Sequence, residues 1–129
     1  MTLGRRILVV EDNELNLKLV RDVLGHAGFD VVEARTGEEG VELASTCGPA
    51  LILMDLQLPD IDGAEALRRI RSNEHGRTVP VVAVTAFAMR ADRERAVDDG
   101  FAGYIEKPIS TRELPRQVAE YLTKEDRLG

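Results

Sequence analysis

Asp55 follows an apolar run, where an acidic side chain is placed to react. The four residues before it, LILM, favour a strand buried on both faces, whereas Pro59, Asp62 and Gly63 shortly after it favour a turn. The carboxylate is therefore expected at the carboxyl end of a strand. In open α/β sheets, ligands bind in the crevice beyond that end. Asp55 is thus a candidate reactive group.

Three further apolar runs also lead into polar side chains. The runs and their polar groups are residues 6–11 with Glu11 and Asp12, residues 79–84 with Thr85, and residues 103–106 with Lys107. Because parallel strands bring their carboxyl ends to one edge of a sheet, we expect these groups beside Asp55. That edge would carry three carboxylates, one hydroxyl and one ammonium group.

The chemistry of such an edge follows from its charges. Two like charges about 4 Å apart repel by roughly 4 kcal/mol at an effective dielectric constant near 20, so a divalent cation would relieve the cluster. Ligand sets made only of oxygen suit Mg²⁺. A cation beside a carboxylate, a lysine and a hydroxyl is typical of phosphoryl transfer, with Asp55 as the nucleophile that forms an aspartyl phosphate.

Helical patterns separate the apolar runs. Pairs typical of a helix start occur at Thr36 with Glu39, Asp62 with Glu65, and Ser110 with Glu113. The expected helices lie near residues 15–27, 36–46, 62–71, 89–99 and 110–122, and a further short strand is expected at 29–34. Pro115 predicts that the last helix starts late or bends. Five strands alternating with five helices favour a parallel α/β sheet covered on both faces.

Length and composition narrow the class of protein. A chain of 129 residues fits one domain. A net charge of −6 argues against direct binding to nucleic acid, which basic clusters recognise. No apolar run exceeds the length of a strand, and the N-terminus lacks a signal peptide pattern. We therefore expect a cytoplasmic protein without membrane contact, whose single cysteine, Cys47, forms no internal disulfide.

Four motifs in order resemble the receiver domains (CheY-like) of two-component response regulators: the Glu11-Asp12 pair, LILMD, VTA and YIEKP. The resemblance covers residues 5–124, and VEDNELN and TAFAM are most similar to single-domain regulators of the DivK type and to receivers of hybrid kinases. It implies a (βα)5 flavodoxin-like, doubly wound parallel sheet with strand order 2-1-3-4-5.

The resemblance also implies roles for individual residues. Asp55 would be phosphorylated, and the ligands of Mg²⁺, or alternatively Mn²⁺, would be Asp12, Asp55, the backbone carbonyl of Gln57 and, through water, Glu11. Lys107 and Thr85 would bind the phosphoryl group, Tyr104 would switch, Gly63 would be structural and the peptide before Pro108 would be cis. In such a fold, Gln57 and Phe87 would tune the lifetime of the phosphorylated form.

By the same resemblance, the protein is a signalling switch that catalyses only its own phosphorylation and dephosphorylation. The donor would be a sensor histidine kinase or a histidine phosphotransfer protein. The output would be docking to an unidentified downstream protein, through the face formed by the last two expected helices, near residues 89–99 and 110–122, and the strand at 103–106 between them. The chain ends about twenty residues after Lys107, so no effector domain is expected. A monomer or weak dimer is expected.

Three other classes of protein share parts of this pattern. A phosphohydrolase of the haloacid dehalogenase type needs an aspartate two residues after its nucleophile, where this chain has Gln57. A flavodoxin-like cofactor binder needs a phosphate-binding glycine loop and aromatic residues, which the sequence lacks. A receiver excised from a hybrid kinase would keep the chemistry, although Met1 and the charged C-terminal residues favour a complete protein.

Overall fold

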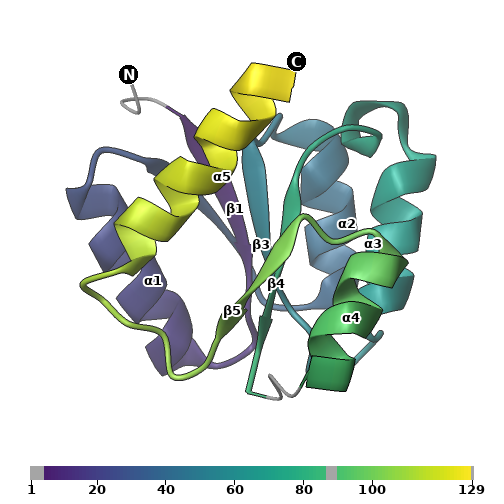
Figure 1. Cartoon of the computed structure of the whole chain (residues 1–129), viewed down its shortest axis with the longest axis horizontal. Coiled ribbons are helices and arrows are strands. Elements are labelled where there is room, and N and C mark those ends of the chain that lie inside the picture. The colour runs from purple at the N-terminus through teal and green to yellow at the C-terminus, as the bar shows by residue number, and fades with distance from the viewer. Residues whose placement is uncertain (1–4, 87–89, 129) are drawn as a thin grey trace.

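Strands and helices alternate along the chain (Figure 1). The structure, a computed structural model, describes residues 5–86 and 90–128. The strands in these ranges are β1 (Arg6–Val10), β2 (Asp30–Ala34), β3 (Leu51–Asp55), β4 (Val81–Thr85) and β5 (Gly103–Glu106). The helices are α1 (Glu14–His26), α2 (Gly37–Thr46), α3 (Gly63–Ser72), the 3₁₀ turn η1 (Glu74–Gly76), α4 (Arg90–Asp99) and α5 (Leu114–Leu128).

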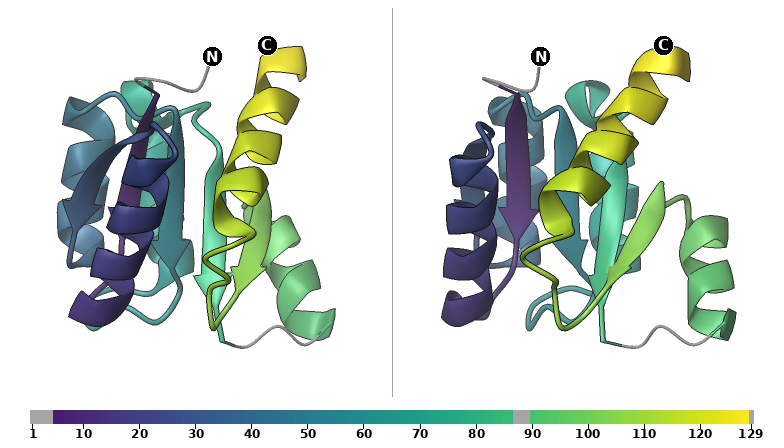
Figure 2. Two further views of the ribbon diagram at one scale, coloured as in Figure 1. Left: turned by 90° about the vertical axis from the view of Figure 1, so that its left-hand side faces the viewer. Right: turned by 60° about the vertical axis from the view of Figure 1, so that its left-hand side comes forward.

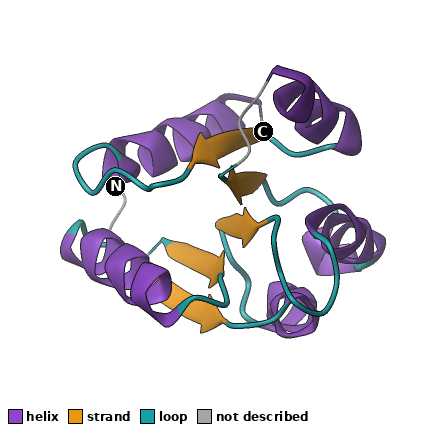
Figure 3. Cartoon of the chain, turned by 90° about the horizontal axis from the view of Figure 1, so that it is seen from below, coloured by secondary structure: helices purple, strands orange, loops and turns teal. Residues whose placement is uncertain are grey.

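The strands form one parallel sheet in the order β2-β1-β3-β4-β5. This confirms the predicted order and the predicted doubly wound architecture. Helices α1 and α5 cover one face, and α2, α3 and α4 cover the other, as the view along the strands shows (Figure 3). The chain therefore forms a three-layer sandwich with the sheet in the middle.

The three central strands are apolar because both of their faces are covered. Alternate strand residues enter two separate core clusters. On the side of α1 and α5 the cluster includes Ile7, Val9, Leu51, Leu53, Val82 and Val84. On the side of α2, α3 and α4 it includes Leu8, Val10, Ile52, Met54, Val81 and Ala83. The strands thus provide a rigid frame that ends at the polar edge.

Helix starts follow the predicted capping pairs in part. The Thr36 hydroxyl accepts a hydrogen bond from the Glu39 amide at 3.0 Å, and the Asp62 carboxylate accepts one from the Glu65 amide at 2.8 Å. The Glu65 carboxylate does not turn back toward Asp62. It accepts hydrogen bonds from Arg68 and Arg69 instead, and these lower its pKa to about 2.

Several boundaries differ from the predictions. Helix α5 begins only at Leu114, because Pro115 then occupies the first turn, where its missing N–H costs no hydrogen bond. Strand β4 begins at Val81, two residues later than predicted, and the segment between α3 and β4 contains η1. On α4, Val97 is 62% exposed, whereas Ala96 is buried.

Gly40 on α2 shows how closely this helix packs on the sheet. A Cβ atom at Gly40 would lie 2.7 Å from Cγ2 of the buried Val10, whereas a Cβ atom at Gly25 on α1 would contact nothing within 4 Å. Gly25→Ala should raise the free energy of unfolding by up to about 1 kcal/mol through helix propensity. Gly40→Ala should lower it by about 1 kcal/mol, since overpacking outweighs that gain.

Urea denaturation of the two alanine variants tests this pair, because each replaces a glycine within a helix. Equal stabilisation by both substitutions would show that α2 moves away from β1 at little cost.

Candidate functional site

The polar residues predicted from the sequence meet at the carboxyl edge of the sheet. Asp55 is the last residue of β3, and Thr85 is the last residue of β4. Glu11 directly follows β1, and Lys107 directly follows β5. Strand β1 points downward in the right-hand view of Figure 2, so this edge lies at the bottom of that picture. Parallel pairing has therefore brought together residues from four separate parts of the chain.

Lys107 forms ion pairs with two buried carboxylates at this edge. Its Nζ atom lies 3.1 Å from Oδ2 of Asp55 and 3.2 Å from Oε2 of Glu11. Asp55 and Glu11 are only 2% and 3% exposed. Burial alone would lower the pKa of Lys107, but the charges of Asp55 and Glu11 together raise it. Lys107 is therefore a fixed positive charge beside the predicted nucleophile.

The surroundings of Glu11 disfavour its ionised form. Burial is the main reason that its pKa is raised, and the nearby charge of Asp55 raises the pKa further. The Asn13 amide and Lys107 act in the opposite direction, without restoring the ordinary pKa. A buried pair of carboxylates with one lysine is therefore short of positive charge.

Backbone amides hold both buried carboxylates in place. The amide of Gln57 donates to Oδ1 of Asp55 at 2.9 Å, and the amide of Asn13 donates to Oε1 of Glu11 at 3.2 Å. Each carboxylate therefore binds a peptide N–H two residues later with one oxygen and Lys107 with the other. This arrangement fixes the side chains before any ligand arrives.

The acidic cluster fits a hard divalent cation. Glu11, Asp12 and Asp55 each offer a carboxylate oxygen, and these oxygens lie within 4.8 Å of one another. Asp12 is exposed, so the cluster is open to solvent on one side. A site whose donors are all oxygen atoms, and whose three carboxylates outnumber the single Lys107 charge, matches the preference of Mg²⁺.

Thr85 ends β4, which flanks β3 and Asp55 on the side opposite to β1 and Glu11. It is 5% exposed and lines a cavity of about 280 Å³ together with Gln57, Gly63 and residues of α4. Tyr104 on β5 is half-buried and packs against the core on the α4 side of the sheet. It pairs in register with Ala83, two residues before Thr85. The two predicted switch residues therefore occupy neighbouring strands.

Two positions near the site, Gly63 and Pro108, were predicted to have structural roles. The peptide between Lys107 and Pro108 is cis. A Cβ atom at Gly63 would lie 2.3 Å from Cδ2 of Leu56 and 3.2 Å from its Cα atom, so a larger residue would require the Leu56 side chain and the loop after β3 to shift. Gln57 is exposed beside Asp55. Phe87, predicted to tune lifetime, lies outside the described residues.

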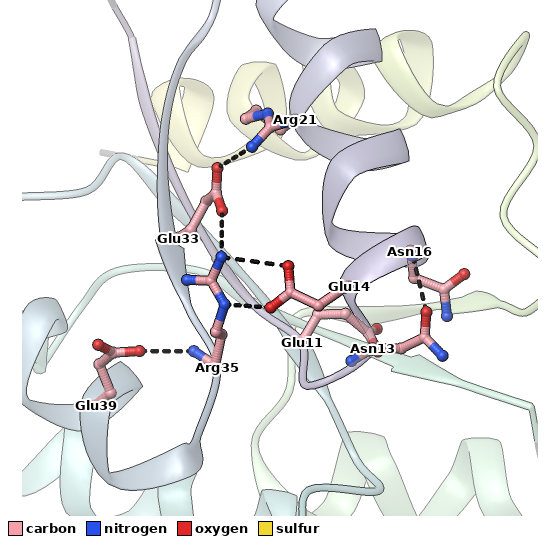
Figure 4. A network of polar contacts seen from close by, with 8 residues as sticks. All are labelled: Glu11, Asn13, Glu14, Asn16, Arg21, Glu33, Arg35 and Glu39. Carbon is pink, nitrogen blue, oxygen red and sulfur yellow. Dashed lines mark hydrogen bonds and ion pairs between the residues drawn. The ribbon is translucent and has the colours of Figure 1, made fainter.

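A polar network next to the site was not predicted. Arg35 donates to both carboxylate oxygens of Glu14 on α1 and lies 3.6 Å from Glu33 on β2, which also binds Arg21 (Figure 4). The network ties the first turn of α1, just after Asp12, to the neighbouring strand. The sequence holds no local pattern for these pairs, because Arg35 and Glu14 are 21 residues apart.

The fold and the acidic edge together define a class of signalling domain. A family model described as "Response regulator receiver domain" matches residues 7–119. The chain belongs to this family and is a receiver domain of two-component signalling.

Two individual proteins show how similar the chain is to members of this family. The chain is 43% identical over 118 residues to the polar-differentiation response regulator DivK of Brucella ovis, covering 92% of this chain and 96% of that protein. It is 38% identical to the receiver domain of a sensor histidine kinase from Pseudomonas aeruginosa, whose crystal structure has a magnesium ion coordinated in the active site cleft. That comparison has a TM-score of 0.85 and covers 93% of this chain and 98% of the other.

A third match supports the same fold. A CheY-like receiver domain protein from Methanospirillum hungatei is 28% identical, has a TM-score of 0.88 and is covered to 99%, with 98% of this chain aligned.

No helix in the described ranges is both long enough and apolar enough to cross a bilayer.

Proposed function

We propose that Asp55 accepts a phosphoryl group from a phosphohistidine of a histidine kinase or phosphotransfer protein. An Asp55 oxygen forms the new O–P bond, the N–P bond of the donor breaks, and its electron pair returns to the imidazole nitrogen. The observation that carries this proposal is the contact of the buried Asp55 carboxylate with Lys107 at 3.1 Å. The lysine would neutralise the charge of the phosphoryl oxygens as they reach the site.

Asp12, Asp55 and the carbonyl of Gln57 would hold a divalent cation, with Glu11 acting through water. Mg²⁺, or alternatively Mn²⁺, would supply positive charge that neutralises the phosphoryl oxygens during transfer. The cluster of three carboxylates supports this assignment, as does the magnesium ion in the similar Pseudomonas aeruginosa receiver. The protein's own contribution is to hold these oxygens in fixed positions through the amides of Asn13 and Gln57.

Phosphorylation would act on the α4-β5-α5 face through Thr85 and Tyr104. Thr85 would move toward the new phosphoryl oxygens, and Tyr104 would turn inward into the space that it leaves. Thr85→Ala should therefore still take up phosphate but lose most of the chemical-shift change at Tyr104 that phosphorylation causes in the wild type. Nuclear magnetic resonance spectra of both proteins, with and without phosphate, test this. An unchanged Tyr104 response in the variant would argue against the coupling.

The proposed switch would act by binding another protein. The output would be docking of the α4-β5-α5 face to a downstream protein in the cytoplasm, without direct contact with nucleic acid or membrane. The domain, proposed to span residues 5–124, would work as a monomer or weak dimer and would act on no substrate other than itself. Gln57 and Phe87 would set the lifetime of the phosphorylated form.

Intact mass spectrometry tests the proposed chemistry directly. After incubation with acetyl phosphate or phosphoramidate and Mg²⁺, the wild type should gain the mass of one phosphoryl group. The adduct should disappear with hydroxylamine, which cleaves acyl phosphates, and should not form in EDTA. If the wild type gains no phosphoryl group from acetyl phosphate or phosphoramidate, the expectation that Asp55 reacts with small-molecule donors is wrong.

A further inference from the structure

Asp60 connects the loop after β3 to a different helix. Its Oδ1 and Oδ2 atoms accept hydrogen bonds from the amides of Gly37 and Glu38, each at 2.9 Å. These amides belong to the first turn of α2 and have no partner within their own helix. One carboxylate therefore satisfies two free amides of an element that lies more than twenty residues earlier in the sequence.

The loop and the helix also touch through apolar atoms. A Cβ atom at Gly37 would lie 2.4 Å from Cγ1 of Ile61 and 3.3 Å from Oδ1 of Asp60. Ile61 is partly buried against the core on this side of the sheet. The absence of a side chain at Gly37 is what allows the helix end to approach the loop. Asp60 and Ile61 thus both contact the first turn of α2 at Gly37.

The same loop carries a group of the reactive edge. It leaves β3 at Asp55, passes through Gln57 and ends at Asp62, which caps α3. The first part is held by the Leu56 amide, which donates to the Val84 carbonyl at 3.1 Å, and the last part by the Asp62 cap. Between these points, Asp60 binds the loop to α2 by hydrogen bonds, and Ile61 packs against the same helix end. The Gln57 amide is held on its own side by Oδ1 of Asp55 at 2.9 Å, so Asp60 supports the loop on the other side of Gln57, beyond its carbonyl.

We propose that Asp60 is a positioning residue that holds the Gln57 carbonyl in place for the divalent cation, an inference that rests on the proposed function. The carboxylate acts at a distance, through the loop, and does not touch the cation. Asp60 and the N-terminus of α2 form an outer support of the site, comparable to the outer partners that orient ligands in metal sites. The loop would be held in its binding geometry before the cation arrives.

Asp60→Ala tests this role when it is compared with Thr36→Ala. Both substitutions remove hydrogen bonds from the first turn of α2, but the Thr36 hydroxyl bonds to Glu39 in the helix itself. Both variants should lose thermal stability to a similar extent. Only Asp60→Ala should weaken Mg²⁺ binding, by roughly three- to tenfold in Kd by calorimetric titration, less than the 10–100-fold typical of a direct outer partner.

A second readout follows the loop without the cation. Hydrogen exchange at the Gln57 amide, which binds Oδ1 of Asp55, should be faster in Asp60→Ala and unchanged in Thr36→Ala. Asp60→Asn keeps one acceptor oxygen, so its Kd should lie between those of the wild type and the alanine variant. This milder variant decides the matter should Asp60→Ala fail to fold.

The outcomes separate this inference from the proposed function. The role of Asp60 would be overturned if its variants kept the Kd for Mg²⁺ and the Gln57 exchange rate of the wild type. It would also be overturned if Thr36→Ala changed both quantities as much as Asp60→Ala does. Either result would leave the proposed function standing. A wild-type protein that neither binds Mg²⁺ nor takes up a phosphoryl group would overturn the proposed function itself.

Discussion

Replacing Asp55 with asparagine should abolish phosphoryl transfer to the protein. The amide keeps the shape of the side chain and can still accept the Gln57 hydrogen bond, but its neutral oxygen is a poor nucleophile. After incubation with phosphoramidate and Mg²⁺, the intact mass of Asp55→Asn should therefore show no adduct, whereas most wild-type molecules should carry one phosphoryl group. This is the largest effect that we expect from a single substitution.

Asp62→Asn is the matched control for that experiment. Asp62 lies seven residues later and caps α3, and asparagine is an equally good capping residue. This variant should be phosphorylated like the wild type. An adduct of wild-type size on Asp55→Asn would mean that another group is the acceptor, and fragmentation of the modified protein would locate it.

The reactive edge was predictable because each of its polar residues ends an apolar run. LILM before Asp55 and RILVV before Glu11 have the length and composition of covered strands, and parallel strands share one carboxyl edge. That reasoning needs no knowledge of side-chain geometry. The strand order, in contrast, came from resemblance to receiver domains, because strand periodicity alone does not say which strands are neighbours.

The supports of the edge were not predictable in the same way. Asp60 stands in a stretch rich in turn-forming residues, and its type and position indicated only a turn. Its partners, Gly37 and Glu38, lie in another helix and meet it only after the sheet has assembled. The pairing of Arg35 with Glu14 is hidden for the same reason. Contacts between a loop and a helix far away in the sequence depend on tertiary packing, which no local pattern encodes.

Local rules also compete at helix ends. Ser110 and Glu113 have the spacing of a capping pair, and the Ser110 hydroxyl does accept a hydrogen bond from the Glu113 amide at 3.3 Å. The helix nevertheless begins at Leu114, because a start at Ser110 would place Pro115 where its ring removes a helical hydrogen bond. The fixed geometry of proline thus outweighs a capping preference.

Replacing Lys107 with methionine should destabilise the fold strongly at pH 7 without divalent ions. Methionine preserves much of the apolar stem but leaves Glu11 and Asp55 buried without a counter-charge. The free energy of unfolding, measured by urea denaturation in EDTA, should fall by about 3 kcal/mol, the low end for breaking a buried ion pair, since Lys107 keeps some contact with solvent. Lys18→Met, on the exposed surface of α1, should change it by less than about 0.5 kcal/mol.

The pH dependence of this loss identifies its electrostatic origin. Burial and the charge of Asp55 already raise the pKa of Glu11 above 4.5, and removal of Lys107 should raise it further. A carboxyl group whose folded pKa exceeds its unfolded value adds stability at low pH and loses it as the pH rises through the folded pKa. The deficit of Lys107→Met should therefore shrink as the pH falls from 7 toward 4.5, and Mg²⁺ should stabilise this variant more than the wild type. A deficit that stays constant with pH and Mg²⁺ would instead mean that Lys107 supports the fold through packing alone.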